Sequence, residues 1–107
     1  MLNERTAWWM SELMRHSGRA VAEAGRELGR FDSRPWLGNV RLPAAMVLTA
    51  RDAAVSPAKQ HELAAAMGAT VFEVPLDHLE LISRDAEYNA ALLSALQAVG
   101  ARAGVRA

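Results

Sequence analysis

The stretch AAMVLTARDAAVSPAKQHELAAAMGATVFEVPLDHLE (44–80) decides the fold of this chain. Its first run, 44–49, is apolar up to the final threonine, which is typical of a strand buried on both faces of a parallel sheet. A second short strand, TVFEV (70–74), follows after a segment with the pattern of a helix. Strand, helix and strand in this order predict a βαβ unit with two parallel strands and a right-handed crossover.

The helix between these strands has clear start and stop signals. Ser56 suits the N-cap position and Pro57 the first helical residue, because proline lacks the N–H that a helix start leaves unpaired. Apolar residues then recur up to Met67, and Gly68 is a typical helix end. We therefore expect a helix from Pro57 to Gly68.

Toward the N-terminus, the pattern predicts a helical hairpin over residues 1–30. Bulky apolar residues recur with a helical period over 4–15. Ser17 can cap a second helix over 18–28, which Gly29 would end.

Two further segments flank the βαβ unit. Residues 31–43 contain two prolines and a glycine that interrupt regular structure, so we expect a connector. Residues 85–98 carry apolar side chains at helical spacing and predict a C-terminal helix, followed by a frayed tail over 101–107.

The predicted fold class is therefore α/β, with two parallel strands in a βαβ unit, an N-terminal helical hairpin and a C-terminal helix. Two parallel strands do not make a stable sheet alone, because their edges and faces must be covered. The missing material would be further strands of the same domain, a partner polypeptide or a second copy of this chain.

Composition excludes several classes of function. The chain has 107 residues, 51% of them hydrophobic, and its 12 basic and 12 acidic residues give no net charge, so nucleic acid and anionic membrane are not expected partners. There is no cysteine and no apolar run of about 18 residues, which argues against thiolate metal sites and membrane spans. Residues 1–9 lack the pattern of a signal peptide. We expect a cytoplasmic protein with no cofactor.

Asp52 and His78 are the candidate catalytic residues, because each follows a predicted strand. An acid that orients a histidine, and a histidine that shuttles protons, are two members of a hydrolytic triad. Each has a simpler alternative: Asp52 as a turn residue bonded to its own backbone, and His78 as a solvated loop histidine. The six serines at 11, 17, 33, 56, 83 and 94 lack the G-x-S-x-G setting of a nucleophile elbow.

The order of these segments resembles the C-terminal part of an α/β-hydrolase. The resemblance rests on the hairpin, RFDSRPWLGNVRLP (30–43), the strand, ARDAAVSP (50–57), TVFEVP (70–75) and DHLE (77–80). It implies that Asp52 is the triad acid and His78 the triad histidine, although Asp77 stands where the family usually has glycine. Residues 1–30 would end the cap and 31–107 would form part of the catalytic core.

The resemblance implies a partial esterase-like or lipase-like hydrolase for an ester or small acyl substrate. Because the nucleophile elbow is absent, we do not expect activity from this chain alone. A different possibility is a non-catalytic remnant or interaction module, which binds a partner or itself through an exposed sheet edge. A third is that residue 1 is an internal position of a longer chain.

Other polar and aromatic residues have weaker interpretations. In the cap, Trp8 and Trp9 would line an apolar substrate site, but adjacent tryptophans on a helix are more often core or interface residues. Asp77 and Glu80, even with His61, match no metal-ligand spacing, so we expect solvated charges and no metal site.

Overall fold

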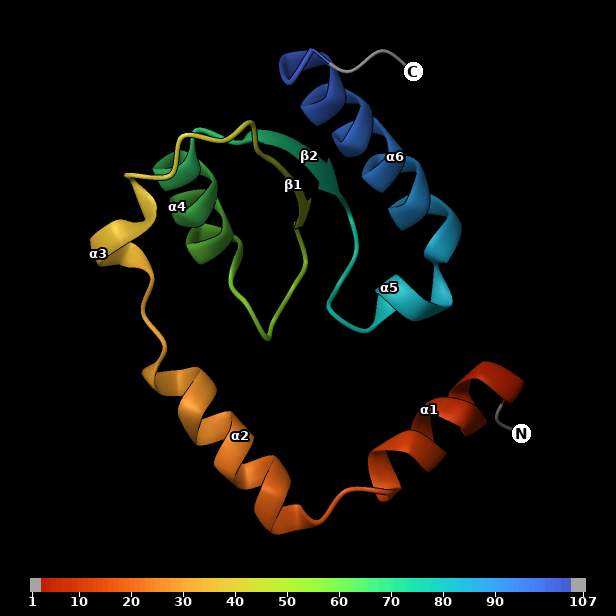
Figure 1. Ribbon diagram of the computed structural model, residues 1–107. Coiled ribbons are helices and arrows are strands. Elements are labelled where there is room, and N and C mark those ends of the chain that lie inside the picture. Colours follow the sequence, from red (N-terminus) through yellow and green to blue (C-terminus); the bar gives the residue numbers. More distant parts are fainter. Residues whose placement is uncertain (1–2, 105–107) are drawn as a thin grey trace. The chain divides into compact units, whose positions relative to one another are not determined.

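The computed structural model describes residues 3–104, which divide into two units between Ser33 and Arg34. The first unit consists of helices, and the second contains the sheet (Figure 1). No described helix is both long enough and apolar enough to cross a bilayer.

The N-terminal unit contains helices α1 (Glu4–Met14) and α2 (Gly18–Arg30). Both begin with a side-chain cap: Asn3 accepts a hydrogen bond from the Thr6 backbone N–H, and Ser17 accepts one from that of Ala20. Neither helix contains a buried residue, so the predicted hairpin does not enclose a core of its own.

The second helix of this unit ends later than the sequence predicts. Gly29 does not adopt the left-handed conformation with which glycine ends a helix, and α2 therefore continues to Arg30. The chain leaves the helix at Phe31, whose backbone is extended.

The C-terminal unit has four helices and two strands among its described residues. In chain order they are α3 (Arg34–Leu37), β1 (Ala45–Thr49), α4 (Pro57–Met67), β2 (Thr70–Val74), α5 (Glu80–Ser83) and α6 (Asp85–Arg102). Strands β1 and β2 pair in parallel, in the register Ala45↔Thr70 to Thr49↔Val74. The strand–helix–strand arrangement predicted for residues 44–74 is confirmed.

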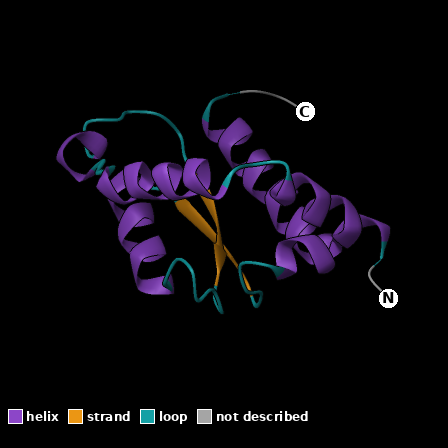
Figure 2. Ribbon diagram, turned by 90° about the horizontal axis from the view of Figure 1, so that it is seen from below, coloured by secondary structure: helices purple, strands orange, loops and turns teal. Residues whose placement is uncertain are grey.

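The core of this unit lies on both faces of the two strands. The strands run between α4 and α6 in both ribbon views (Figures 1 and 2), and α6 contacts both strands whereas α4 contacts β1. The buried apolar residues are Leu37, Ala44, Leu48, Ala64, Val74, Leu76 and Ala95.

The predicted limits of α4 are also confirmed. Ser56 accepts a hydrogen bond from the Lys59 N–H, Pro57 begins the helix, and Gly68 follows it with φ of 61°. This left-handed conformation is the one that glycine adopts without steric cost. The sharp end of α4 lets the chain enter β2 only two residues later, at Thr70.

Two other segments differ from the sequence-based expectation. The connector contains the short helix α3, and α6 extends beyond residue 98 to Arg102. The Arg102 guanidinium donates to the carbonyls of Ala44 at 3.3 Å and Gly68 at 3.4 Å, which ties the last turn of α6 to the residues just before β1 and β2. Residues 105–107 of the predicted tail lie outside the described residues.

Candidate functional site

The loops that follow β1 and β2 lie side by side because the pairing of the strands continues beyond their ends. The Arg51 N–H donates to the Leu76 carbonyl at 3.1 Å, and the Leu76 side chain is fully buried. Asp52 follows Arg51 directly, and His78 lies two residues after Leu76. Their side chains therefore meet at the carboxyl end of the sheet, although 26 positions separate them in the sequence.

The contact between these two residues is a hydrogen bond. His78 Nδ1 lies 3.0 Å from Asp52 Oδ2. The Asp52 side chain is only 3% exposed, whereas that of His78 is 53% exposed. The acid is thus sequestered from solvent, and the imidazole can still be approached from outside.

Both oxygens of the Asp52 carboxylate accept further hydrogen bonds. Oδ1 accepts from the backbone N–H groups of Ala54 at 2.8 Å and Val55 at 2.9 Å, and Oδ2 accepts from the Thr49 hydroxyl at 2.8 Å. The turn that was an alternative interpretation of Asp52 is therefore present together with the bond to His78. Oδ1 accepts the bonds of the turn, and Oδ2 accepts the bond from His78.

These donors hold the pKa of Asp52 well below its ordinary value. The bond from Val55 N–H has the largest effect; burial opposes it, and the bonds from His78, Thr49 and Ala54 lower the pKa further. Asp52 is consequently ionised at neutral pH.

The ionised carboxylate determines which nitrogen of His78 carries the proton. A carboxylate has no hydrogen to donate, so His78 Nδ1 must be the donor in this bond. In the neutral imidazole the lone pair is then on Nε2. His78 is thus arranged to accept a proton at Nε2 while Nδ1–H stays bonded to Asp52.

Two residues that sequence reasoning missed, Thr49 and Gln60, complete this polar group. Both are buried, and the Gln60 side chain forms hydrogen bonds with Thr49. The available signal was weak: Gln60 lies one helical turn before the buried Ala64, which places a polar residue on the apolar face of α4.

The loop of His78 is held by Asp77 and Glu80. Asp77 Oδ1 accepts from the N–H groups of Leu79 and Glu80, and Glu80 Oε2 accepts from the Asp77 N–H at 2.8 Å. This reciprocal arrangement resembles a capping box, with His78 inside it. These two acids, expected as solvated charges, are only partly exposed and also bond to the backbone of the loop, so Asp77 has a structural use at the position where a glycine was expected.

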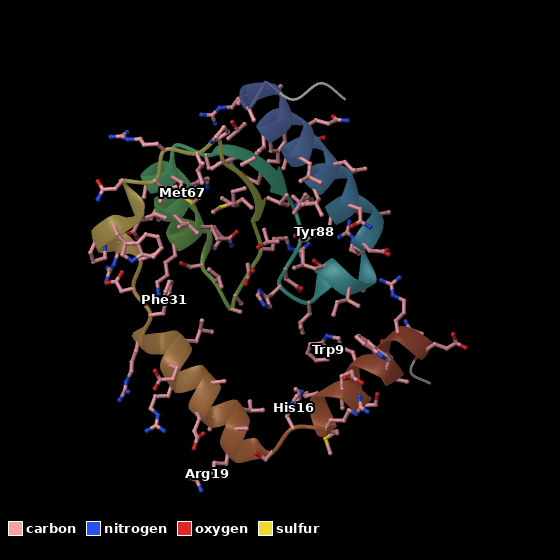
Figure 3. The ribbon with its side chains drawn as sticks, in the orientation of Figure 1. Trp9, His16, Arg19, Phe31, Met67 and Tyr88 are labelled. Atoms are coloured by element: carbon pink, nitrogen blue, oxygen red, sulfur yellow. The ribbon has the colours of Figure 1, made fainter. Side chains whose placement is uncertain are left out.

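The other candidate residues belong to the N-terminal unit. Trp8 and Trp9 lie on α1 in the other unit, are 63% and 41% exposed, and line a hollow of about 230 Å³ with Glu12, Leu13 and His16. Figure 3 shows Trp9 and His16 on this part of the chain. A role for the tryptophans in substrate binding stays a prediction.

Metal ligands and serine hydroxyls were the remaining candidates for chemistry. Within residues 3–104, no group of three or more acidic or histidine side chains is placed to hold a metal ion. Ser11 and Ser94 donate to backbone carbonyls in their own helices, and Ser17 and Ser56 cap helices. These four hydroxyls thus serve local structure.

Comparison of the chain with models of protein families, with curated proteins and with solved structures finds no match. The chemistry available to Asp52 and His78 is determined by their geometry. Three features of that geometry matter: the buried acid, the half-exposed imidazole and the proton on Nδ1.

Proposed function

We propose that residues 34–104 contain the acid and base of an α/β-hydrolase-type site for an ester or small acyl substrate. The observation that carries the proposal is the 3.0 Å bond between His78 Nδ1 and the buried carboxylate of Asp52. The location supports it as well, because ligands of open parallel sheets bind outside the carboxyl ends of the strands.

In the proposed reaction, His78 acts first as a base and then as an acid. Nε2 accepts the proton of a nucleophile hydroxyl as that oxygen bonds to the acyl carbon of the substrate. The imidazolium is stabilised by the Asp52 carboxylate and then gives the proton to the leaving alkoxide as the ester bond breaks. Water repeats the sequence on the acyl intermediate, which returns the nucleophile and His78 to their starting states.

The nucleophile and the oxyanion hole would come from a segment outside residues 1–107. None of the six serines has the G-x-S-x-G setting, and four of them have the local hydrogen bonds described above. Such a segment would bring further strands, and these would cover the edges of the two-stranded parallel sheet.

The test is hydrolysis of p-nitrophenyl butyrate by two proteins. One is the 107-residue chain, and the other is this chain lengthened by the residues encoded upstream of codon 1. We expect no turnover above the buffer rate from the first. We expect turnover from the second, reduced about 10³-fold or more by His78→Ala.

His61→Ala is the matched control, since His61 is an exposed histidine on α4. It should leave turnover of the lengthened chain unchanged. A lengthened chain that hydrolyses the ester equally well with and without His78 would contradict the proposal. An upstream sequence with no nucleophile elbow would count against it too.

A second candidate function is that of an interaction module, and a groove beside β1 favours it. The groove has a volume of about 200 Å³ and is lined by Ala45, Val47, Tyr88, Leu92, Ala95, Leu96 and Val99. Tyr88 is labelled on α6 in Figure 3. Leu96 is 59% exposed, although it belongs to this apolar surface. Such a surface is suited to pack against an added strand or a second copy of the chain.

Light scattering across a concentration series tests the second function. Self-association that Leu96→Lys abolishes would support it, whereas a monomer at all concentrations would oppose self-association. Gln97→Lys, an exposed change of the same charge on the same helix, is the control.

A further inference from the structure

The side chain of Gln60 joins the two ends of the loop that carries Asp52. Its Oε1 accepts from the Thr49 N–H at 2.9 Å, and its Nε2 donates to the Thr49 carbonyl at 3.2 Å and the Val55 carbonyl at 2.9 Å. Thr49 is the last residue of β1, and Val55 directly precedes the N-cap of α4. One buried amide therefore bonds to the backbone on both sides of Asp52.

The bonds to Thr49 take the place of a neighbouring strand. The Ala50 N–H donates to the Val74 carbonyl, so the peptide groups of Ala50 point toward β2. Because successive residues of a strand point their N–H and C=O groups to opposite sides, those of Thr49 point away from β2. The Gln60 amide supplies both the acceptor and the donor that a third strand would have offered there.

The same amide also orients the Thr49 hydroxyl. Thr49 Oγ1 lies 2.8 Å from the ionised Asp52 Oδ2 and 3.3 Å from Gln60 Oε1, so its single hydrogen is better placed toward the carboxylate. The hydroxyl oxygen lies 3.1 Å from Gln60 Nε2 and shares one of its two N–H hydrogens with the Thr49 carbonyl. Gln60 thereby supports one of the donors to Asp52 Oδ2, the oxygen that His78 contacts.

Gln60 also stabilises the position of Asp52 Oδ1, through Val55. Asp52 Oδ1 accepts from the N–H groups of Ala54 and Val55, and the carbonyl of Val55 is held by Gln60. Loss of the amide would free both ends of the loop at once. The carboxylate would then be able to turn away from His78.

We propose that Gln60 is a positioning residue, which holds the Asp52 loop so that the carboxylate stays bonded to His78 Nδ1. The catalytic meaning of this role rests on the function proposed above. The structural claim concerns the proton on His78, and it can be tested whether or not the chain takes part in ester hydrolysis.

The test is nitrogen-15 NMR of His78 in the full chain, above the pH at which the ring is charged. We expect neutral His78 to hold its proton on Nδ1 in the unmodified chain. In Gln60→Met, we expect at least half of that population to move to the Nε2–H form, and the slowly exchanging Nδ1–H signal to be lost. Gln97→Met, the same substitution at the exposed glutamine of α6, should change neither.

A second variant distinguishes the role of the Gln60 acceptor, Oε1, from that of its donor, Nε2. Gln60→Glu retains an acceptor for the Thr49 N–H but loses the donor to the Val55 carbonyl, so we expect faster exchange of the Val55 amide proton than in the unmodified chain. Unchanged His78 spectra in a folded Gln60→Met protein would overturn the proposal.

If Gln60→Met does not fold, the unmodified chain supplies the deciding measurement. The Gln60 side-chain amide protons should exchange at the same slow rate as the Val55 N–H, because both are released by one opening of the loop. Exchange of the Gln60 protons at the rate of a solvated amide would refute the proposal. Altered His78 spectra with no effect on ester turnover in the lengthened chain would retain Gln60 as a positioning residue but reject the proposed function.

Discussion

The two units of this chain form helices by the same local rules, but only one of them buries side chains. Helices α1 and α2 have side-chain caps and surface ion pairs such as Arg19–Glu23, and no residue in them is buried. The C-terminal unit buries Leu48 and Leu76 almost completely. Isolated helices of 11 and 13 residues are marginal in water, so we expect the N-terminal unit to be much the less stable.

The same substitution in each unit tests this contrast most strongly. Leu48 is 1% exposed in β1, and Leu28 is 75% exposed in α2. Leu48→Ala should cost about 2–5 kcal/mol in the free energy of unfolding, whereas Leu28→Ala should change it by less than about 0.5 kcal/mol. Urea unfolding followed by circular dichroism measures both, and equal losses would contradict the contrast.

The buried carboxylate of Asp52 should have a smaller effect on the stability of the C-terminal unit, and this effect should depend on pH. The pKa of Asp52 is lower in the folded chain than in the unfolded one, so its contribution to stability is complete above the unfolded value near pH 4 and is lost as pH falls toward the folded value. Between about pH 6 and pH 2, the thermal midpoint of the C-terminal unit should therefore fall less steeply in Asp52→Asn.

Glu12 of α1, whose side chain is 39% exposed, provides the comparison for this titration, because its ion pair with Arg15 lies at the surface. Glu12→Gln should leave the pH profile unchanged. If Glu12→Gln flattened the pH profile and Asp52→Asn did not, the acid-sensitive group would lie on α1 and not at Asp52. That result would contradict the prediction.

Glycine substitutions should have small effects of opposite sign in the two units. Gly68 has φ of 61°, so Gly68→Ala should cost about 1–2 kcal/mol, although space for the methyl group is open. Gly25 lies inside α2 with equally open space, so Gly25→Ala should stabilise that helix by about 0.5–1 kcal/mol. Unfolding of the first variant and the helical circular dichroism of the second measure these changes; the same sign in both would contradict the local geometry.

The sequence was sufficient to predict features that have local signals. The apolar run before Thr49 marked β1, and Ser56, Pro57 and Gly68 marked α4 because each is suited to a particular backbone position. The proximity of Asp52 and His78 followed from the parallel strands, since the carboxyl ends of such strands meet at one edge of the sheet.

Other features depend on tertiary contacts that leave no local pattern. Gln60 is an ordinary residue for an exposed helix, and only the fold brings it to Thr49 and Val55. In the extension of α6, Arg102 bonds to carbonyls far away in the sequence, a contact that no local pattern marks. Gly29 is a different case: glycine is a common helix end, but this one keeps a helical backbone in α2, which has no buried residue.

The amide of Gln60 also limits how the sheet can grow. Because it already occupies the outward peptide groups of Thr49, an incoming strand could bond to β1 only at Ala45 and Val47. Its pairing with β1 would thus stop before the loop of Asp52. A strand could therefore be added to β1 without a change in the conformation of the Asp52 loop.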